Sequence, residues 1–216
     1  PIMKKNIILS FVIALILGCA GSMQKISFDM NLDQVERPKD AKERFGEINT
    51  TVVDSLGKQY LNFEDDLIKA QFLFGYSQIG LLLENKSEHT MKINWDNAAW
   101  ISPSGNSSRV IHSGVRLMDR NSPQSPSVVV RNGKLSDIII PSDNIYFESG
   151  QYGGWRYLGL IHHTSVMTMD MQAELSKAKS QVGKTCGVLL PIEIEGVQND
   201  YIFTFAIGEA TIKDRY

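Results

Sequence analysis

GVLLPIEIE (residues 187–195), GVQND (196–200) and YIFTFAI (201–207) form the stretch that decides the fold class. Every second residue of the third segment is large and apolar: Tyr201, Phe203, Phe205 and Ile207. Because successive side chains of a strand point to opposite faces, this period of two predicts a strand that covers a core. The middle segment is rich in turn-forming residues, so we expect an antiparallel hairpin with a turn of about five residues. Pro191 lacks a backbone N–H, which predicts a sheet edge or a bulge at that point.

Similar short apolar runs, separated by Gly, Pro, Asn and Ser clusters, recur upstream of this hairpin. The strands that we expect lie at residues 48–53, 60–64, 68–74, 78–84, 91–100, 109–112, 128–130, 134–140, 185–195 and 201–212. This spacing is typical of a sandwich or a barrel. We therefore predict a mainly β domain over residues 45–216, built as an antiparallel β-sandwich.

One segment has helical rather than strand periodicity. Apolar residues recur there at spacings of three or four: Met167, Met171, Leu175, Ala178 and Val182. Acidic residues come early, basic residues come late and Gly183 follows, as helix termini prefer. The pattern predicts one short helix near residues 166–182. Its methionines suit either an adaptable binding groove or core packing, and packing is the favoured interpretation.

The start of the chain has the three parts of an export signal. Lys4 and Lys5 precede an apolar run at residues 7–17, and Gly18 is the small residue expected at a cleavage site. A membrane-spanning helix needs roughly 20 apolar residues, and this run is shorter. We therefore predict a signal helix at residues 1–18, of which residues 1–2 are extraneous.

The residues Ile16-Leu17-Gly18-Cys19 resemble the lipobox of bacterial lipoproteins. This resemblance implies cleavage after Gly18, a diacylglycerol on the sulfur of Cys19 and, usually, an acyl group on the new amino group. Ala20 stands where an aspartate would imply retention at the inner membrane, so the family pattern implies an outer-membrane lipoprotein of the cell envelope. The alternative is an ordinary secreted protein with a chance cysteine after its signal.

Between Cys19 and the β domain we expect a tether at residues 19–44. This segment has few large apolar residues, contains Pro38 and ends in a charged run. A flexible tether of this length spans about 25 to 30 Å on average. The folded domain would then stand clear of the lipid headgroups.

Net charge argues against a nucleic-acid-binding protein, and cysteine content argues against a protein stabilised by an intramolecular disulfide. Cleavage removes Lys4 and Lys5, which leaves 20 basic and 24 acidic residues and a net charge near −4. Such a chain is unsuited to non-specific nucleic-acid binding. With Cys19 committed to lipid, Cys186 has no partner for an intramolecular disulfide, and its apolar surroundings predict a small buried side chain.

The residues that could support catalysis lack the spacing that catalysis needs. The four histidines, His89, His112, His162 and His163, show no metal-ligand motif, and neighbouring histidines on a strand point to opposite faces. The acidic run Glu64-Asp65-Asp66 lacks a calcium-loop pattern and reads as a solvated turn. We therefore predict no catalytic residue, no metal and no cofactor, and a protein that is not an enzyme.

The middle of the chain resembles uncharacterised bacterial lipoproteins with immunoglobulin-like β-sandwich domains. The similarity rests on residues 85–87, 92–101, 103–105, 109–112 and 140–141, together with the C-terminal hairpin. It extends over most of residues 60–212. The resemblance implies an immunoglobulin-like sandwich and names no activity.

Candidate ligand-binding residues are Trp155, Trp100, His162 and His163. Trp155 follows Gly153 and Gly154, which predicts an exposed loop. Trp95 and Trp100 could join it in an aromatic platform, although their spacing favours one buried and one partly covered position. We expect a non-catalytic binding or scaffold role with other envelope proteins as partners. A cell-wall or surface-glycan binding module is the alternative, and a hydrolase that uses His162 or His163 ranks third.

Overall fold

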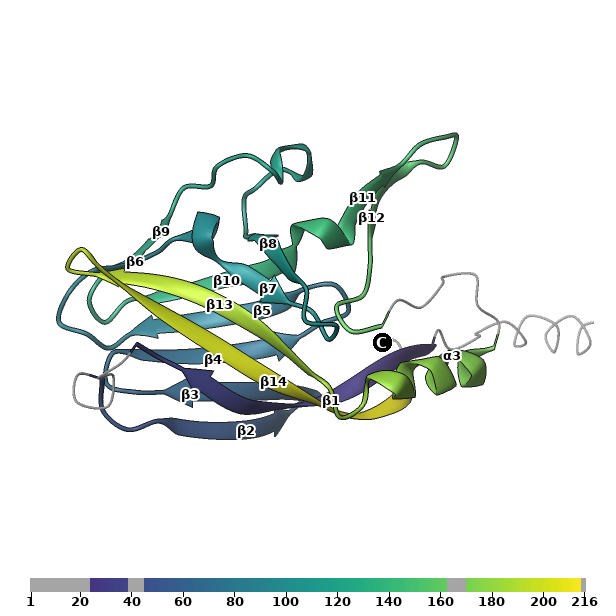
Figure 1. Ribbon diagram of the computed structural model, residues 1–216, viewed down its shortest axis with the longest axis horizontal. Helices are drawn as coiled ribbons and strands as arrows, with labels where there is room; N and C mark the ends of the chain where they lie inside the picture. Colours follow the sequence, from purple (N-terminus) through teal and green to yellow (C-terminus); the bar gives the residue numbers. More distant parts are fainter. Residues whose placement is uncertain (1–23, 39–44, 163–169, 215–216) are drawn as a thin grey trace, which may run out of the picture.

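The computed structural model describes residues 24–38, 45–162 and 170–214 (Figure 1). The strands are β1 (Gln24–Glu36), β2 (Asn49–Ser55), β3 (Lys58–Glu64), β4 (Ile68–Phe74), β5 (Ile79–Asn85), β6 (Met91–Ile93), β7 (Ala99–Ile101), β8 (Ser107–Ile111), β9 (Ser127–Val129), β10 (Lys134–Pro141), β11 (Ile145–Glu148), β12 (Gly154–Tyr157), β13 (Thr185–Ile194) and β14 (Val197–Asp214). The helical elements are α3 (Met171–Ala178) and the short 3-10 turns η1 (Trp95–Asn97), η2 (Leu117–Asp119), η3 (Ser142–Asn144) and η4 (Lys179–Gln181).

Twelve strands form one antiparallel sheet, in the order β1-β14-β13-β7-β8-β10-β5-β4-β3-β2, with β6 beside β13 and β9 beside β6. The sheet curls until it is nearly closed into a barrel (Figure 1). Strands β11 and β12 form a separate hairpin. The mainly β, antiparallel prediction is confirmed, whereas this topology does not establish an immunoglobulin-like sandwich. The predicted signal helix lies outside the described residues.

The hairpin of β13 and β14 pairs continuously from Thr185 with Ala206 to Ile194 with Val197. Its turn consists of two residues, Glu195 (φ 52°) and Gly196 (φ 77°). Positive φ at both positions is the geometry that matches the twist of paired strands. The five-residue turn predicted from the sequence is therefore wrong, because residues 197–200 continue the strand.

Pro191 lies inside the sheet, where the neighbouring strand is interrupted. Strand β6 ends opposite Ile192 and β7 begins opposite Leu189, with η1 between them. The carbonyl of Pro191 accepts a hydrogen bond from the Asn94 backbone N–H over 3.0 Å. The backbone N–H and C=O of a strand residue point to the same side of the strand. The side on which Pro191 lacks a donor therefore faces the same gap. The predicted continuous strand at residues 91–100 is wrong for the same reason: η1 divides it.

Aromatic rings fill the space between the two walls of the curled sheet. The alternating set on β14, at most 2% exposed, is confirmed as core. Phe203 packs against Phe63 and Phe72 with ring centroids 5.3 and 4.8 Å apart, and Phe205 packs against Phe72 and Phe74. These contacts hold β14 against β3 and β4.

The prediction of a tether at residues 19–44 is wrong for residues 24–36, which form β1 and pair with β14. Ile26, Phe28, Met30 and Leu32 alternate with small or polar residues, which is a strand pattern. Met30 is 2% exposed and belongs to the main core, with Phe28 and Leu32 packed against it. The charged and amide residues between them lowered the apparent hydrophobicity of a genuine edge strand.

The predicted helix is present but shorter. Its described part begins after Asp170, whose Oδ1 accepts hydrogen bonds from the backbone N–H groups of Gln172 and Ala173, a typical N-cap. Residues 166–169 lie outside the described part. Ala178 is buried as predicted, whereas Val182 is exposed beyond η4.

Candidate functional site

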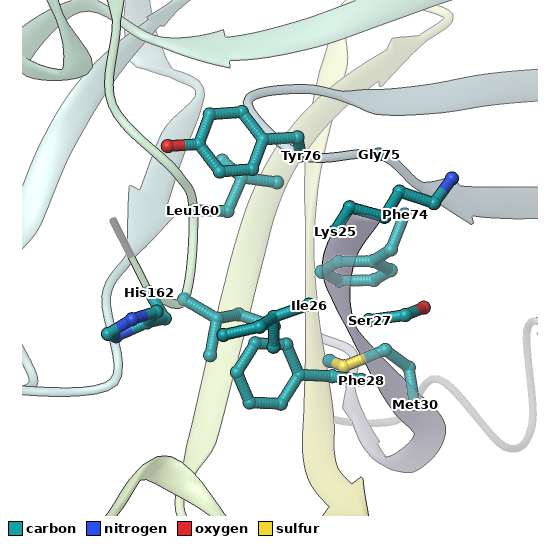
Figure 2. A pocket seen from close by; sticks show the side chains of 11 residues that line it. Lys25, Ile26, Ser27, Phe28, Met30, Phe74, Gly75, Tyr76, Leu160 and His162 are labelled. Carbon is teal, nitrogen blue, oxygen red and sulfur yellow. The ribbon is translucent and has the colours of Figure 1, made fainter. Parts of the chain in front are cut away.

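A cavity of about 360 Å³ lies where the curled sheet stays open, between the first half of β1, the β4–β5 turn and residues 160–162 (Figure 2). We call it the seam cavity. Its lining residues are Lys25, Ile26, Ser27, Phe28, Met30, Phe74, Gly75, Tyr76, Leu160, Ile161 and His162. Its volume falls within the range of roughly 300 to 1,000 Å³ that is common for ligand pockets.

The outer edge of β1 borders this cavity. Lys25, Ile26, Ser27 and Phe28 all line it, although consecutive side chains of a strand point to opposite faces. Only a strand whose edge faces the cavity can contribute from both faces. β1 is the terminal strand of the sheet, and no described strand pairs with its outer edge. On that side, the Met30 backbone N–H donates to Oε1 of Gln59 over 2.7 Å.

The opposite wall depends on a close chain reversal at Gly159. A Cβ atom there would lie 2.1 Å from the carbonyl oxygen of His162 and 3.0 Å from the ring of Tyr76. Only glycine permits this approach. The Leu160 backbone N–H donates to the Tyr76 carbonyl over 2.8 Å, which joins residues 160–162 to the β4–β5 turn.

His162 is at the rim of the seam cavity, beside a carboxylate. Its Nε2 lies 3.2 Å from Oε2 of Glu174, and Nζ of Lys177 donates to Oε1 of Glu174 over 2.8 Å. The hydrogen bonds from Lys177 and His162 lower the pKa of Glu174 below its ordinary value of 4.5. Ser27 lies well away from His162 in Figure 2. His163 lies outside the described residues.

Trp155 lies on β12 rather than in a loop, so the loop prediction is wrong. Together with Tyr146, Phe147, Tyr152 and Tyr157 it belongs to residues 145–157, which we call the aromatic hairpin. Trp155 is half-buried, with the guanidinium of Arg120 5.2 Å from its ring centre and the ring of Phe147 5.5 Å away. One face of the indole is thus occupied by Arg120.

The other tryptophans offer no surface to a ligand. Trp95 is 0% and Trp100 2% exposed. Trp95 stacks on His112 with centroids 4.6 Å apart, and its Nε1 donates to Ser127 over 2.8 Å. The structure therefore does not bring Trp100 to the surface beside Trp155.

No cluster of three or more metal-ligating side chains occurs within the described ranges. Nδ1 of His112 lies 3.2 Å from Oδ2 of Asp137, and Nδ1 of His89 lies 3.2 Å from Oε1 of Glu195. Each of these two histidines thus pairs with one carboxylate of the described residues. Cys186 is buried as predicted, and burial raises the pKa of its thiol to about 12.

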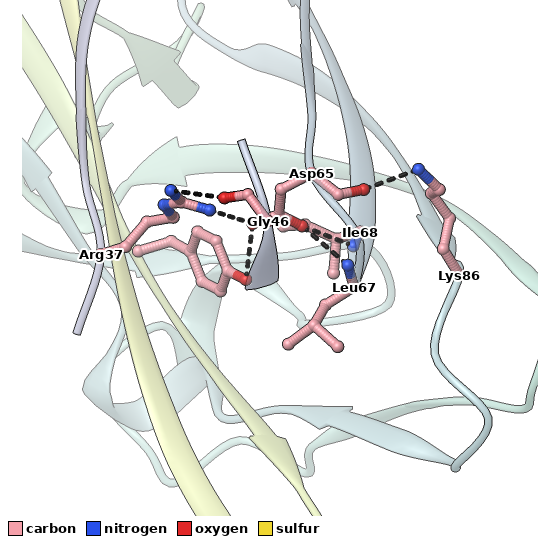
Figure 3. A network of polar contacts seen from close by, with 7 residues as sticks. Arg37, Gly46, Asp65, Leu67, Ile68 and Lys86 are labelled. Atoms are coloured by element: carbon pink, nitrogen blue, oxygen red, sulfur yellow. Dashed lines mark hydrogen bonds and ion pairs between the residues drawn. The ribbon is translucent and has the colours of Figure 1, made fainter. Parts of the chain in front are cut away.

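Asp65 is buried, and the interpretation of its segment as a solvated turn is wrong for this residue (Figure 3). Its carboxylate accepts hydrogen bonds from the backbone of Leu67 and Ile68, each at 2.9 Å, and from Arg37 and Tyr201, each at 3.1 Å. Arg37 follows β1, Asp65 follows β3 and Tyr201 lies on β14. Sequence analysis missed this network because its partners are far apart along the chain.

Comparisons with known proteins leave the family of this chain open. No protein-family model matches it, and no curated protein sequence matches it. Among solved structures it is similar to the X-ray structure of Northeast Structural Genomics Consortium target SoR45, at 10% identity and a TM-score of 0.25, over 84% of this chain and 86% of that chain. A similarity at this level supports no statement about fold or function. Within the described ranges, no helix is long and apolar enough to cross a bilayer.

Proposed function

We propose that this protein is a lipid-anchored envelope lipoprotein that holds an extended segment of a protein partner at the seam cavity, without catalysis. One observation carries the proposal: the outer edge of β1, with which no described strand pairs, borders a cavity lined mainly by apolar residues. A free strand edge presents backbone N–H and C=O groups that a partner strand can pair with. The cavity beside it can receive the partner's side chains.

The lining chemistry indicates what kind of segment fits. Phe28, Phe74 and Leu160 offer apolar contacts, while Lys25 and His162 supply polar groups. In strand addition, main-chain hydrogen bonds provide affinity and alternate side chains provide selectivity. The partner segment is therefore extended, with apolar residues at alternate positions.

The anchor would place this site near the membrane. If lipid is attached to Cys19, Gln24 at the start of β1 is five positions further along the chain. A fully extended chain advances at most about 3.6 Å per residue, so this connection reaches no more than about 18 Å. The partner would then be held close to the bilayer surface that carries the lipid.

Photo-crosslinking in living cells tests the proposal. Benzoylphenylalanine replaces Tyr76, which lines the cavity and is 44% exposed, in the full chain. The matched control replaces Val128, which is 58% exposed on β9, at the end of the molecule opposite the start of β1 (Figure 1). Mass spectrometry of the product identifies the captured segment and reports the lipid on Cys19. A Cys19→Ala chain tests whether capture needs the anchor.

The expected result is capture of defined extended segments of envelope proteins from position 76 and not from position 128. Ile26→Asn should abolish capture, whereas Ile48→Asn, at an exposed site away from the cavity, should not. Equal capture from both positions would contradict the strand-addition site. Recovery of cell-wall material instead would favour the alternative, a glycan-binding module. The proposal rests on the outer edge of β1 and does not require an immunoglobulin-like topology. That topology stays a separate prediction.

A further inference from the structure

The aromatic hairpin stands apart from the main sheet. Its two strands pair with each other, from Ile145 with Tyr157 to Glu148 with Gly154. The hairpin projects from the body, on the side of the molecule where β1 begins (Figure 1). The β13–β14 turn lies at the opposite end. An anchor attached close before β1 would therefore bring the hairpin, and not that turn, towards the membrane.

The surface of the hairpin has an unusual composition for a solvent-exposed element. Five of its residues are aromatic, and four of these are substantially exposed: Tyr146, Phe147, Tyr152 and Tyr157, at 43, 60, 85 and 38%. Its only charged side chains, Glu148 and Arg156, form an ion pair of 2.8 Å. The hairpin thus presents aromatic rings and polar tips with no net charge.

We propose that the aromatic hairpin inserts into the headgroup region of the bilayer that holds the Cys19 lipid and acts as a second point of membrane contact. This inference rests on the lipid anchor of the proposed function. Tyr and Trp prefer the membrane–water interface because one end of each ring is apolar and the other forms hydrogen bonds. The paired charges add little cost at that depth, since they carry no net charge together.

A second contact would fix the orientation of the domain. A lipid on Cys19 alone is a single point of attachment and does not by itself fix the orientation of the domain. With the hairpin also inserted, the start of β1 and the seam cavity would face the membrane, and the β13–β14 turn would face away from it. The seam cavity would then open towards segments of membrane proteins near the bilayer surface.

Tryptophan fluorescence in vesicles tests the insertion. Trp95 and Trp100 are buried and provide a constant background. Into a Trp155→Phe chain we introduce Tyr152→Trp in the hairpin, or Val197→Trp beside the β13–β14 turn as the matched control. The full chains are reconstituted into phosphatidylcholine–phosphatidylglycerol vesicles with or without brominated acyl chains. Mass spectrometry of each sample reports the lipid on Cys19.

Insertion predicts roughly twofold lower emission from the tryptophan at position 152 in brominated vesicles and unchanged emission from position 197. Lipid on Cys19 without quenching at position 152 would overturn the hairpin inference and leave the anchor standing. Capture of a protein by benzoylphenylalanine at position 152, without quenching, would assign the hairpin to a protein partner and would also overturn it. Absence of lipid on Cys19 would count against the proposed function. If the tryptophan at position 152, and not that at position 197, were quenched in such a sample, bilayer contact by the hairpin would still be supported.

Discussion

The hydroxyl of Tyr201 donates a hydrogen bond to Oδ2 of Asp65 across 3.1 Å, although the two residues are 136 positions apart in the chain. Both side chains are buried, and Arg37 donates to the same carboxylate oxygen. This contact connects β14, the β3–β4 turn and the end of β1. It holds the curled sheet together at the C-terminal end of β1, which is the end farther from the seam cavity.

Two substitutions that remove different parts of this hydrogen-bond network should destabilise the protein by different amounts. Tyr201→Phe deletes one hydrogen bond to a charged group and should lower the free energy of unfolding by about 1.5 to 3 kcal/mol. Asp65→Ala leaves Arg37 and two backbone N–H groups without their acceptor and should cost about 3 to 5 kcal/mol. Urea unfolding of the purified full chain measures both values. Equal, small effects would show that the network contributes little.

Gly159→Ala should distort the seam cavity. The added Cβ would meet the His162 carbonyl at 2.1 Å, so the wall at residues 160–162 must shift. We expect a loss of about 1 to 3 kcal/mol in unfolding free energy and a loss of crosslinking from position 76. Gly80→Ala is the control, because its Cβ would meet Leu73 at an ordinary 3.6 Å. Retained crosslinking in Gly159→Ala would argue that the wall does not shape the site.

Glu64 should contribute fully to stability above pH 4.5, and this contribution should be lost as the pH falls through its lowered folded-state pKa. Hydrogen bonds from Lys86 and then Lys69 lower its folded-state pKa below the ordinary value of 4.5. A lowered carboxyl pKa stabilises the folded state above the unfolded pKa, and the contribution is lost as the pH falls through the folded pKa. Glu64→Gln should therefore be less stable than the parent at pH 7, by no more than about 1 kcal/mol for a surface pair. The difference should vanish at low pH, and a carboxyl titration midpoint at or above 4.5 would contradict this account.

Cys186 should not react with thiol reagents in the folded protein. Burial raises the pKa of its thiol to about 12, so almost no thiolate, the reactive form, exists at pH 8. In a Cys19→Ala chain, where Cys186 is the remaining thiol, we expect negligible modification at pH 8 and rapid modification in urea, followed with a chromogenic disulfide reagent. Fast labelling without denaturant would show that β13 opens readily.

The C-terminal hairpin shows what local sequence determines. Alternation of Phe203 and Phe205 with smaller residues is encoded within a few positions, and it predicted the buried face of β14 correctly. The strand at Ile68–Phe74 was predicted with its observed bounds. The same alternation is present in β1, but the few large apolar residues of that segment, Pro38 and the charged run after it favoured a tether instead.

Sequence by itself determined the antiparallel β class, the core face of β14, the burial of Cys186 and an N-terminal pattern that predicts lipidation at Cys19. Only the tertiary structure decided that Asp65 would meet Arg37 and Tyr201, that β1 would join the sheet, and that its outer edge would border the seam cavity. The physical reason is range. Strand periodicity depends on neighbours two residues apart, whereas a free edge, a buried carboxylate and a projecting hairpin depend on how the whole sheet curls and where its closure stops.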